Sequence, residues 1–140
     1  MTPICKRAMS RGISVLSFDS GVAQAGRVLQ INPSNPALIG EKQIEMVHKT
    51  IGGKGEIAIL SATTQATNQN TWIQVMQAVL QKPEYKELQL VDVVYGDDQS
   101  DKSYREAIGL LSKHPNLKAI ISPTTVGITA SAKAVTDQKL

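Results

Sequence analysis

Short apolar runs alternate with longer segments of helical periodicity along most of the chain. Runs typical of strands lie at Ile13–Phe18, Arg27–Ile31, Ile57–Leu60, Leu88–Tyr95 and Leu117–Ile121. Between the later runs, apolar residues recur at spacings of three and four, which indicates amphipathic helices. Strand and helix therefore repeat at roughly the length of a βαβ unit. This order predicts an α/β fold, a three-layer α/β/α sandwich around a mostly parallel sheet.

Capping residues mark the ends of the first two predicted helices. Gly12 can supply the left-handed residue that terminates a helix, so the chain is expected to begin within a helix that ends there. The apolar run that follows Gly12 is expected to form a buried strand. Ser34 or Asn35 caps the second helix, Pro36 lies in its first turn, and Gly52 stops it.

Apolar stripes predict three further helices. The first of them follows the i, i+3, i+4, i+7, i+8 pattern of a helix laid on a core, formed by Trp72, Val75, Met76, Val79 and Leu80. The next is capped by Ser100 or Asp101, and its stripe consists of Tyr104, Ala107, Ile108 and Leu111. The last begins at Thr124 or Thr125 and runs through Ile128, Ala132 and Val135.

The composition is that of one ordinary globular domain. A chain of 140 residues with 41% hydrophobic and 19% charged residues can bury one core, and no apolar run is long enough to cross a bilayer. The net charge is +3, but the basic residues are scattered, so we predict no nucleic-acid partner. The single Cys5 has no disulfide or metal partner, and Met1–Cys5 is too short to be an export signal.

Polar residues follow the predicted strands at the edge where an open parallel sheet binds ligands. Four such loops begin at Asp19, Ser61, Gly96 and Ser122, and the second carries a dense polar run from Thr63 to Asn70. Neutral amides beside a carboxylate suit a polyhydroxylated ligand, because each sugar hydroxyl both donates and accepts a hydrogen bond. A capped helix after a polar loop explains the same pattern, and that alternative stays open.

Other candidate sites find less support in the sequence. The glycines of Gly52–Gly55 follow a helix and precede a strand, which is the reverse of a phosphate-binding loop. His48 and His114 lie away from the ligand edge, so no catalytic group is expected. Asp97 and Asp98 lack the spacing of a calcium loop, and helix capping is favoured for them. Trp72 lies in the register of a core residue rather than of a sugar-stacking one.

Four segments resemble the solute receptors of ABC importers for rhamnose and related sugars, a branch shared with furanone autoinducer receptors. They are Val15–Ser20, Gly55–Thr63, Asn68–Trp72 and Ile120–Thr125. The resemblance implies a type I periplasmic binding protein fold, incomplete here. Residues 1–26 would be the tail end of the first lobe, and residues 27–140 a second lobe without its final strands and helices. Arg27–Ile31 would cross between the lobes.

The resemblance also implies a function and a set of ligand-binding residues. Asp19 would accept hydrogen bonds from a sugar in the first lobe, and Asn68, Gln69, Pro123 and Thr125 would line the second lobe. Furanone receptors have aspartate at the position of Asn68, and this difference favours a sugar ligand. Rhamnose is the sugar that the resemblance implies. Recognition would be noncovalent, without a cofactor, metal or enzymatic activity. Membrane permease subunits would be the partners, the compartment would be the periplasm, and the isolated chain is expected to self-associate.

Two other functional classes remain as alternatives. The effector-binding core of a LacI-type transcription regulator shares the implied fold, and a helix-turn-helix upstream would identify it. An enzyme on a doubly wound sheet is the second alternative, because fold alone does not fix function. That enzyme would need a phosphate loop or a catalytic cluster, and the sequence contains neither.

Overall fold

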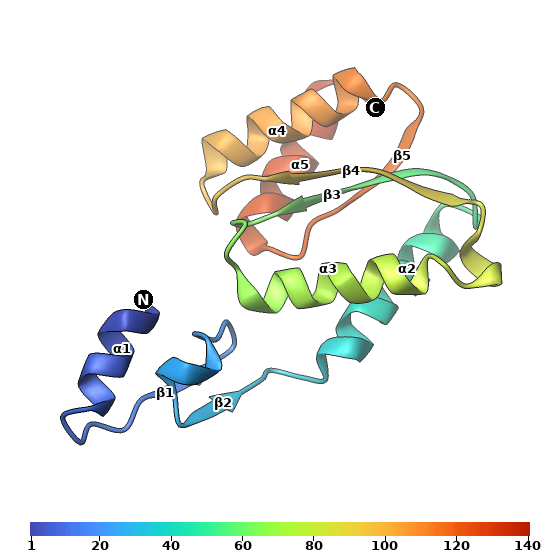
Figure 1. Cartoon of the computed structure of the whole chain (residues 1–140). Coiled ribbons are helices and arrows are strands. Elements are labelled where there is room, and N and C mark those ends of the chain that lie inside the picture. Colours follow the sequence, from blue (N-terminus) through green and yellow to red (C-terminus); the bar gives the residue numbers. More distant parts are fainter.

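The computed structural model describes residues 1–140, which form a small N-terminal part and a larger body (Figure 1). The N-terminal part consists of α1 (Thr2–Met9), β1 (Leu16–Phe18), the 3₁₀ turn η1 (Gln24–Gly26) and β2 (Leu29–Ile31). The body consists of α2 (Pro36–Thr50), β3 (Gly55–Ser61), α3 (Thr67–Val79), the 3₁₀ turn η2 (Pro83–Tyr85), β4 (Leu88–Tyr95), α4 (Ser100–Lys113), β5 (Leu117–Ile121) and α5 (Thr125–Asp137). None of these helices combines the length and apolar character that a membrane span requires.

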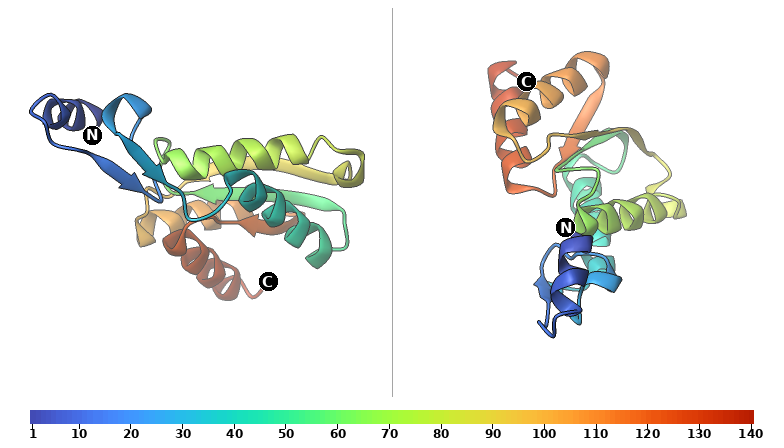
Figure 2. Two further views of the ribbon diagram at one scale, coloured as in Figure 1. Left: turned by 90° about the horizontal axis from the view of Figure 1, so that it is seen from below. Right: turned by 60° about the vertical axis from the view of Figure 1, so that its left-hand side comes forward.

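The body is a three-layer sandwich, as the sequence predicts. Its parallel sheet has the order β4-β3-β5, with β3 in the centre. Helices α2 and α3 cover one face of the sheet, and α4 and α5 cover the other (Figures 1 and 2). The carboxyl ends of all three strands therefore lie at the same edge, because parallel strands share one direction.

The main core lies between the sheet and the pair α2 and α3. Strand β3 is buried on both faces, and Ile57 to Leu60 have no exposed surface. Ile44 of α2 and Met76 of α3 are equally buried against it. Trp72 belongs to the same cluster, which confirms its predicted core position. A smaller core around Leu60, Ala107 and Ala134 lies under α4 and α5.

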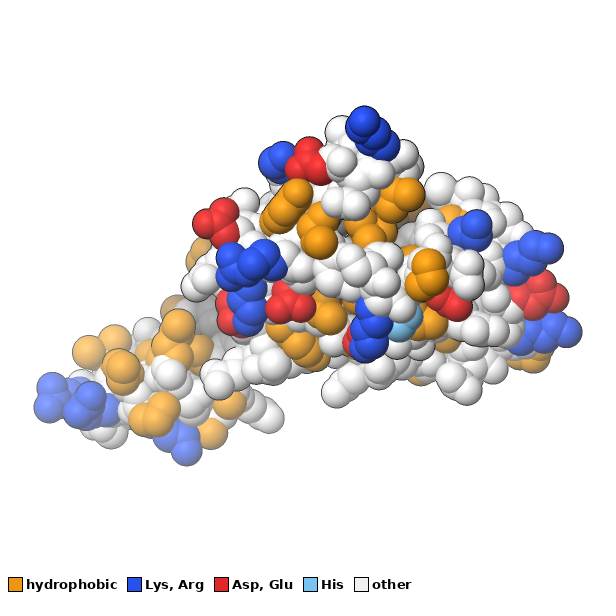
Figure 3. Space-filling model, turned by 90° about the horizontal axis from the view of Figure 1, so that it is seen from above, with side chains coloured by type: hydrophobic (Ala, Val, Ile, Leu, Met, Phe, Trp, Pro, Cys, Tyr) orange, Lys and Arg blue, Asp and Glu red, His pale blue; other side chains and the backbone are white.

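The N-terminal part is a two-stranded parallel ribbon, and its apolar side chains are exposed. Leu16 pairs with Leu29 and Phe18 with Ile31, yet 77% of the Phe18 surface and 56% of the Ile31 surface are accessible. Figure 3 shows hydrophobic side chains across this projecting part. The prediction of a buried strand over Ile13–Phe18 is therefore wrong, because two strands alone cover neither of their own faces.

The pairing of β2 shows to which part of the chain this strand belongs. Strand β2 pairs with β1 and not with the sheet of the body. Most of the Arg27–Ile31 segment therefore lies with the N-terminal part, and the chain enters the body through the following residues. A boundary after residue 26 stays a prediction.

The start of α4 and the buried face of α5 differ from what the sequence pattern indicates. Helix α4 is capped by the backbone of Gln99, one residue before the predicted Ser100 or Asp101. Helix α5 begins at Thr125 as predicted, but Ile128 is exposed and Ala132 also faces solvent. Its buried residues are small: Gly127, Ala130, Ser131 and Ala134. Small side chains let α5 approach α4 closely, so close packing rather than apolar character selects its buried face.

Strand β4 forms one edge of the sheet and carries a single acidic residue that ties it to α4. The register against β3 shifts at Val91, which is a β-bulge. The next residue, Asp92, accepts a hydrogen bond from the backbone N–H of Val93 at 2.9 Å and pairs with Lys113 at 2.8 Å. His114 lies 3.4 Å from the same carboxylate. The hydrogen bond from Lys113 is the main reason why the pKa of Asp92 lies below its ordinary value.

Replacing this carboxylate should change the acid stability of the fold. A group whose pKa is lowered by folding stabilises the protein above its unfolded pKa, about 3.9 for Asp, and this contribution is lost as the pH falls through the folded value. We expect Asp92→Asn to lower the free energy of unfolding at pH 7 by about 1 kcal/mol, since Lys113 is largely exposed and screened. The difference in the free energy of unfolding between this variant and the wild type should vanish in strong acid. Urea denaturation at a series of pH values measures this difference, with Glu87→Gln as the control variant. A difference that does not change with pH would contradict the stabilising role of the ionised Asp92 carboxylate.

Gly40 sets the distance between α2 and α3. A Cβ at this position would lie 2.7 Å from both the Trp72 carbonyl oxygen and Val75 Cβ. No residue larger than glycine fits between the helices without moving them.

Alanine should therefore destabilise the protein at Gly40 although it favours helix formation. We expect Gly40→Ala to reduce the free energy of unfolding by about 1 to 2 kcal/mol, because overpacking outweighs the gain in helix propensity. Gly109 of α4 is the matched control, since a Cβ there meets nothing within 4 Å. Gly109→Ala should stabilise by up to about 1 kcal/mol. Equal effects of the two substitutions in urea denaturation would show that the helices are not in close contact.

Candidate functional site

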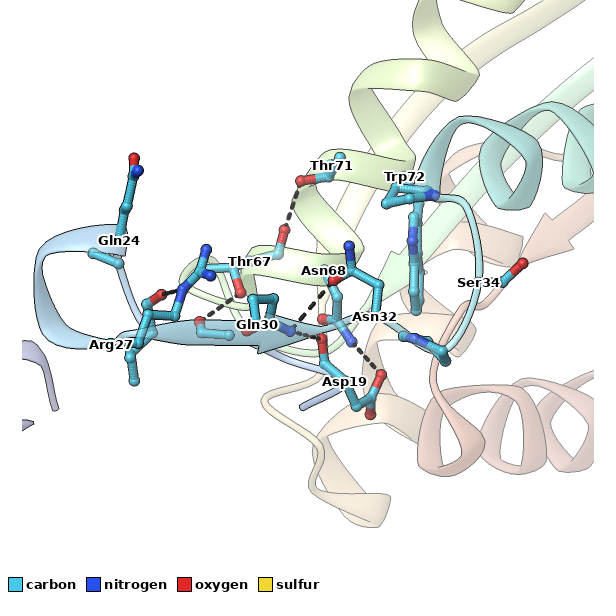
Figure 4. A pocket seen from close by; sticks show the side chains of 15 residues that line it. Asp19, Gln24, Arg27, Gln30, Asn32, Ser34, Thr67, Asn68, Thr71 and Trp72 are labelled. Atoms are coloured by element: carbon cyan, nitrogen blue, oxygen red, sulfur yellow. Dashed lines mark hydrogen bonds between the residues drawn. The ribbon is translucent and has the colours of Figure 1, made fainter. Parts of the chain in front are cut away.

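The structure brings the loop after β1 to the first turn of α3. The Asn68 side-chain amide donates a hydrogen bond to the Asp19 carboxylate at 3.2 Å, across 49 residues of sequence. Beside it, the Thr67 hydroxyl donates to the Gly21 carbonyl oxygen at 2.7 Å. Both bonds connect the N-terminal part to the body (Figure 4). Two of the residues that the sequence predicts as ligand-binding thus face each other.

Asp19 is fixed by its own backbone and by a glutamine of β2. Its φ of 57° lies in the left-handed region, which aspartate tolerates better than most residues. Its carbonyl oxygen accepts a hydrogen bond from the Gln30 side-chain amide at 3.0 Å. The Gln30 amide oxygen in turn accepts the Ser17 hydroxyl hydrogen at 2.5 Å. These contacts hold the Asp19 backbone in place while one carboxylate oxygen meets Asn68.

The polar run that the sequence places in a loop divides between the loop and α3. Helix α3 already begins at Thr67, so Asn68, Gln69 and Asn70 belong to its first turn. Asn70 donates from its side chain to the Thr64 carbonyl oxygen at 2.8 Å, which closes the short loop. The Asn68 carboxamide oxygen accepts from the Gln69 backbone N–H at 2.8 Å. The polar residues therefore form the helix start and shape the loop before it.

Gln69 lies deeper than Asn68 and bonds within the fold. Its side chain is buried, and its amide oxygen accepts from the Ser61 hydroxyl at 2.8 Å and from the Ala62 backbone N–H at 2.9 Å. These bonds fasten the start of α3 to the end of β3. The amide oxygen is thereby occupied, and only the amide nitrogen is left without a partner in the chain.

Two cavities share the Asp19 and Asn68 pair as a common wall. The larger, about 630 Å³, lies at the carboxyl ends of β3 and β4. Its polar lining includes Asp19, Ser20, Thr63, Gln65, Thr67, Asn68, Gln69 and Asp98. The smaller, about 310 Å³, lies on the other side of the pair and is drawn in Figure 4. Its polar lining includes Gln24, Arg27, Gln30, Asn32, Thr71 and one edge of Trp72.

Pro123 and Thr125 lie at the carboxyl end of β5 but line neither cavity. The residue between them, Thr124, is buried and donates its hydroxyl hydrogen to the carboxylate of Asp98. Asp98 does line the larger cavity. The loop after β5 therefore reaches the cavity wall through this bond, and direct contact of Pro123 or Thr125 with a ligand stays a prediction.

The larger cavity offers many hydrogen-bonding groups, and the two aspartates in its lining form no ion pair. Neither Asp19 nor Asp98 forms an ion pair with lysine or arginine, whereas Asp97 pairs with Lys102 at 2.6 Å. No group of three or more His, Cys, Asp or Glu is placed to hold a metal ion. Two free carboxylates among amides and hydroxyls are suited to accept hydrogen bonds from a neutral ligand with many hydroxyls.

The specific contacts of three residues of this region could not be predicted from the sequence. Gln30 lies within a strand pattern, Thr67 within a polar run, and Asp98 within a run of capping residues. Their roles depend on contacts between segments far apart in the sequence. Thr67 meets Gly21 across 46 residues, for example, and Asp98 meets Thr124 across 26.

Several solved structures are similar to this chain. A solute-binding protein of an ABC transporter from Clostridium phytofermentas, with bound L-rhamnose, is 39% identical with a TM-score of 0.96 over 98% of this chain. A sugar ABC transporter protein from Actinomyces odontolyticus is 44% identical with a TM-score of 0.73 over 96%. A solute-binding protein from Burkholderia graminis, in complex with D-arabinose, is 31% identical with a TM-score of 0.84 over 96%.

This chain corresponds to less than half of each of these proteins. It covers 43% of the first, 43% of the second and 45% of the third. The family model described as a periplasmic binding protein domain matches residues 1–140. The resemblance noted in the sequence is thereby confirmed at the level of the family. The chain belongs to the periplasmic binding protein family.

Proposed function

We propose that this chain carries part of the sugar site of a substrate-binding protein that serves an ABC-type sugar importer. The observation that carries the proposal is the Asp19 carboxylate of the N-terminal part, which meets the Asn68 amide of the body at the wall of the larger cavity. A ligand held there would contact both parts of the chain. Such an arrangement suits a receptor that reports ligand binding by bringing two parts together.

The chemistry of the lining favours a sugar over other small ligands. A sugar hydroxyl donates one hydrogen bond and accepts others, so it needs both kinds of partner when water is removed. The cavity supplies carboxylate acceptors at Asp19 and Asp98, amide donors at Asn68 and Gln69, and threonine hydroxyls. A phosphate or carboxylate ligand would be repelled by the two aspartates, neither of which has a cationic partner.

L-Rhamnose is the first sugar to test. The Clostridium phytofermentas protein, which contains L-rhamnose, has a TM-score of 0.96 with this chain. The Burkholderia graminis protein binds a different sugar, D-arabinose, and is less identical at 31%. The ligand set proposed for the sugar is Asp19, Asn68, Gln69, Pro123 and Thr125.

The remaining assignments follow from the same proposal. Residues 1–26 would belong to the first lobe and residues 27–140 to the second. Recognition would be noncovalent and would not change the sugar chemically. Permease subunits of the importer would be the protein partners, and the compartment would be the periplasm. The alternative of a LacI-type regulator is not favoured, because the similar proteins described above belong to transporters.

Removing either member of the central pair should weaken sugar binding. We expect Asp19→Ala and Asn68→Ala each to cost roughly 1 to 3 kcal/mol of binding free energy, because sugar hydroxyls are left without partners. That range corresponds to a rise in the dissociation constant of about 5-fold to 150-fold. An NMR titration of the 140-residue chain with L-rhamnose measures it and also detects weak binding.

Gln77→Ala is the control for these two substitutions. Gln77 is exposed on the same helix and lines neither cavity, so its loss should leave the affinity unchanged. The proposal fails if wild-type affinity persists in both Asp19→Ala and Asn68→Ala, or if no aldose binds to the wild type.

A further inference from the structure

We infer that Asp98 is a second carboxylate ligand for the sugar. Asp98 belongs to the body of the chain, whereas Asp19 belongs to the N-terminal part. This inference rests on the proposed function and adds a residue that determines which ligands the cavity accepts. Asp19 follows β1 in the N-terminal part, and Asp98 follows β4 in the body. Both line the cavity of about 630 Å³. A ligand that contacts both carboxylates would therefore connect the two parts of the chain at a second point besides the Asn68 bond.

The backbone at Asp98 is held in an unfavourable conformation. Asp97 and Asp98 have φ angles of 54° and 53°, both in the left-handed region that residues with a Cβ seldom adopt. Two such residues in succession carry an energetic cost that the surrounding contacts must offset. Conformations of this kind concentrate at ligand-binding sites, where they aim a side chain that a relaxed turn would place elsewhere.

One contact fixes the Asp98 side chain and leaves part of it available. Its Oδ1 atom accepts the hydroxyl hydrogen of Thr124, which is buried and caps α5. Its Oδ2 atom forms no hydrogen bond or ion pair within the chain. The carboxylate is thus oriented by a rigid partner while one oxygen is free to accept a hydrogen bond. This arrangement reduces the entropy that a ligand would otherwise lose by ordering the side chain.

The neighbouring Asp97 shows a contrasting environment. It pairs with Lys102 at 2.6 Å and does not line the cavity. Its charge is compensated within the loop, whereas that of Asp98 is not. The two adjacent aspartates therefore form a matched pair in which only one has the position and the free acceptor that a sugar needs.

The inference predicts a restriction on the ligand. A neutral sugar can donate one hydroxyl to each carboxylate, and hydrogen bonds to an ionised acceptor are stronger than bonds to a neutral one. A sugar acid would place a third negative charge beside two carboxylates that form no ion pair, and it should bind more weakly than a neutral sugar. The accepted class is therefore neutral sugars.

The test compares Asp98→Asn with Asp97→Asn by NMR titration with L-rhamnose. Asparagine keeps an Oδ1 acceptor for Thr124, so the Asp98→Asn variant should fold as the wild type does. We expect its dissociation constant for L-rhamnose to rise about tenfold, and that of Asp97→Asn to stay within about twofold. Thr124→Val removes the hydroxyl but keeps the Asp98 carboxylate. Its dissociation constant should rise less than that of Asp98→Asn, which separates ligand contact from loop support.

The outcomes of these titrations distinguish a failure of the Asp98 contact from a failure of sugar binding altogether. If the wild type binds and Asp19→Ala weakens binding, but Asp98→Asn behaves like Asp97→Asn, this inference is overturned and the proposed function stands. If the wild type binds no sugar, both are overturned. If the Asp98→Asn variant does not fold, the NMR titration of the wild type still tests whether the sugar contacts Asp98. Saturation with L-rhamnose must shift the backbone amide signals of residues 97–99, and unchanged signals there refute the contact.

Discussion

The parallel pairing of β3 with β4 and β5 is the constraint on which the rest of the structure depends. Because β3 is central and its residues from Ile57 to Ser61 are buried, its apolar run fixes the position of both neighbours and of the helices on both faces. The shared strand direction then gathers the loops that begin near Ser61, Tyr95 and Ile121 at one edge. Every polar group proposed to meet the sugar from the body lies at this edge or in the helix that leaves it.

The contact between the two parts of the chain depends on a few polar bonds rather than on apolar packing. Asn68 meets Asp19 and Thr67 meets Gly21, while the apolar side chains of the N-terminal ribbon remain exposed. Polar contacts of this kind are specific in geometry and modest in net stability. They suit a junction at which a ligand adds hydrogen bonds of its own, and they explain why the cavity wall is also the connection between the two parts.

Most of the body could be predicted from the sequence because local pattern and tertiary packing agree there. The limits of β4 and β5 match their apolar runs, and Asn35 caps α2 as expected. The apolar pattern is a poor guide where packing overrides it, as on α5, whose buried residues are all small. At the site, the residue types indicated a sugar ligand, but the bonds of Asn68 and Asp98 depend on distant partners that no local pattern contains.

The most direct test of the central claim is a crystal structure of this chain grown with saturating L-rhamnose. The account predicts the sugar in the larger cavity, with hydroxyl oxygens about 2.5 to 3.2 Å from the Asp19 carboxylate and the Asn68 amide. A sugar bound elsewhere on the chain, or one that contacts neither residue, would contradict it.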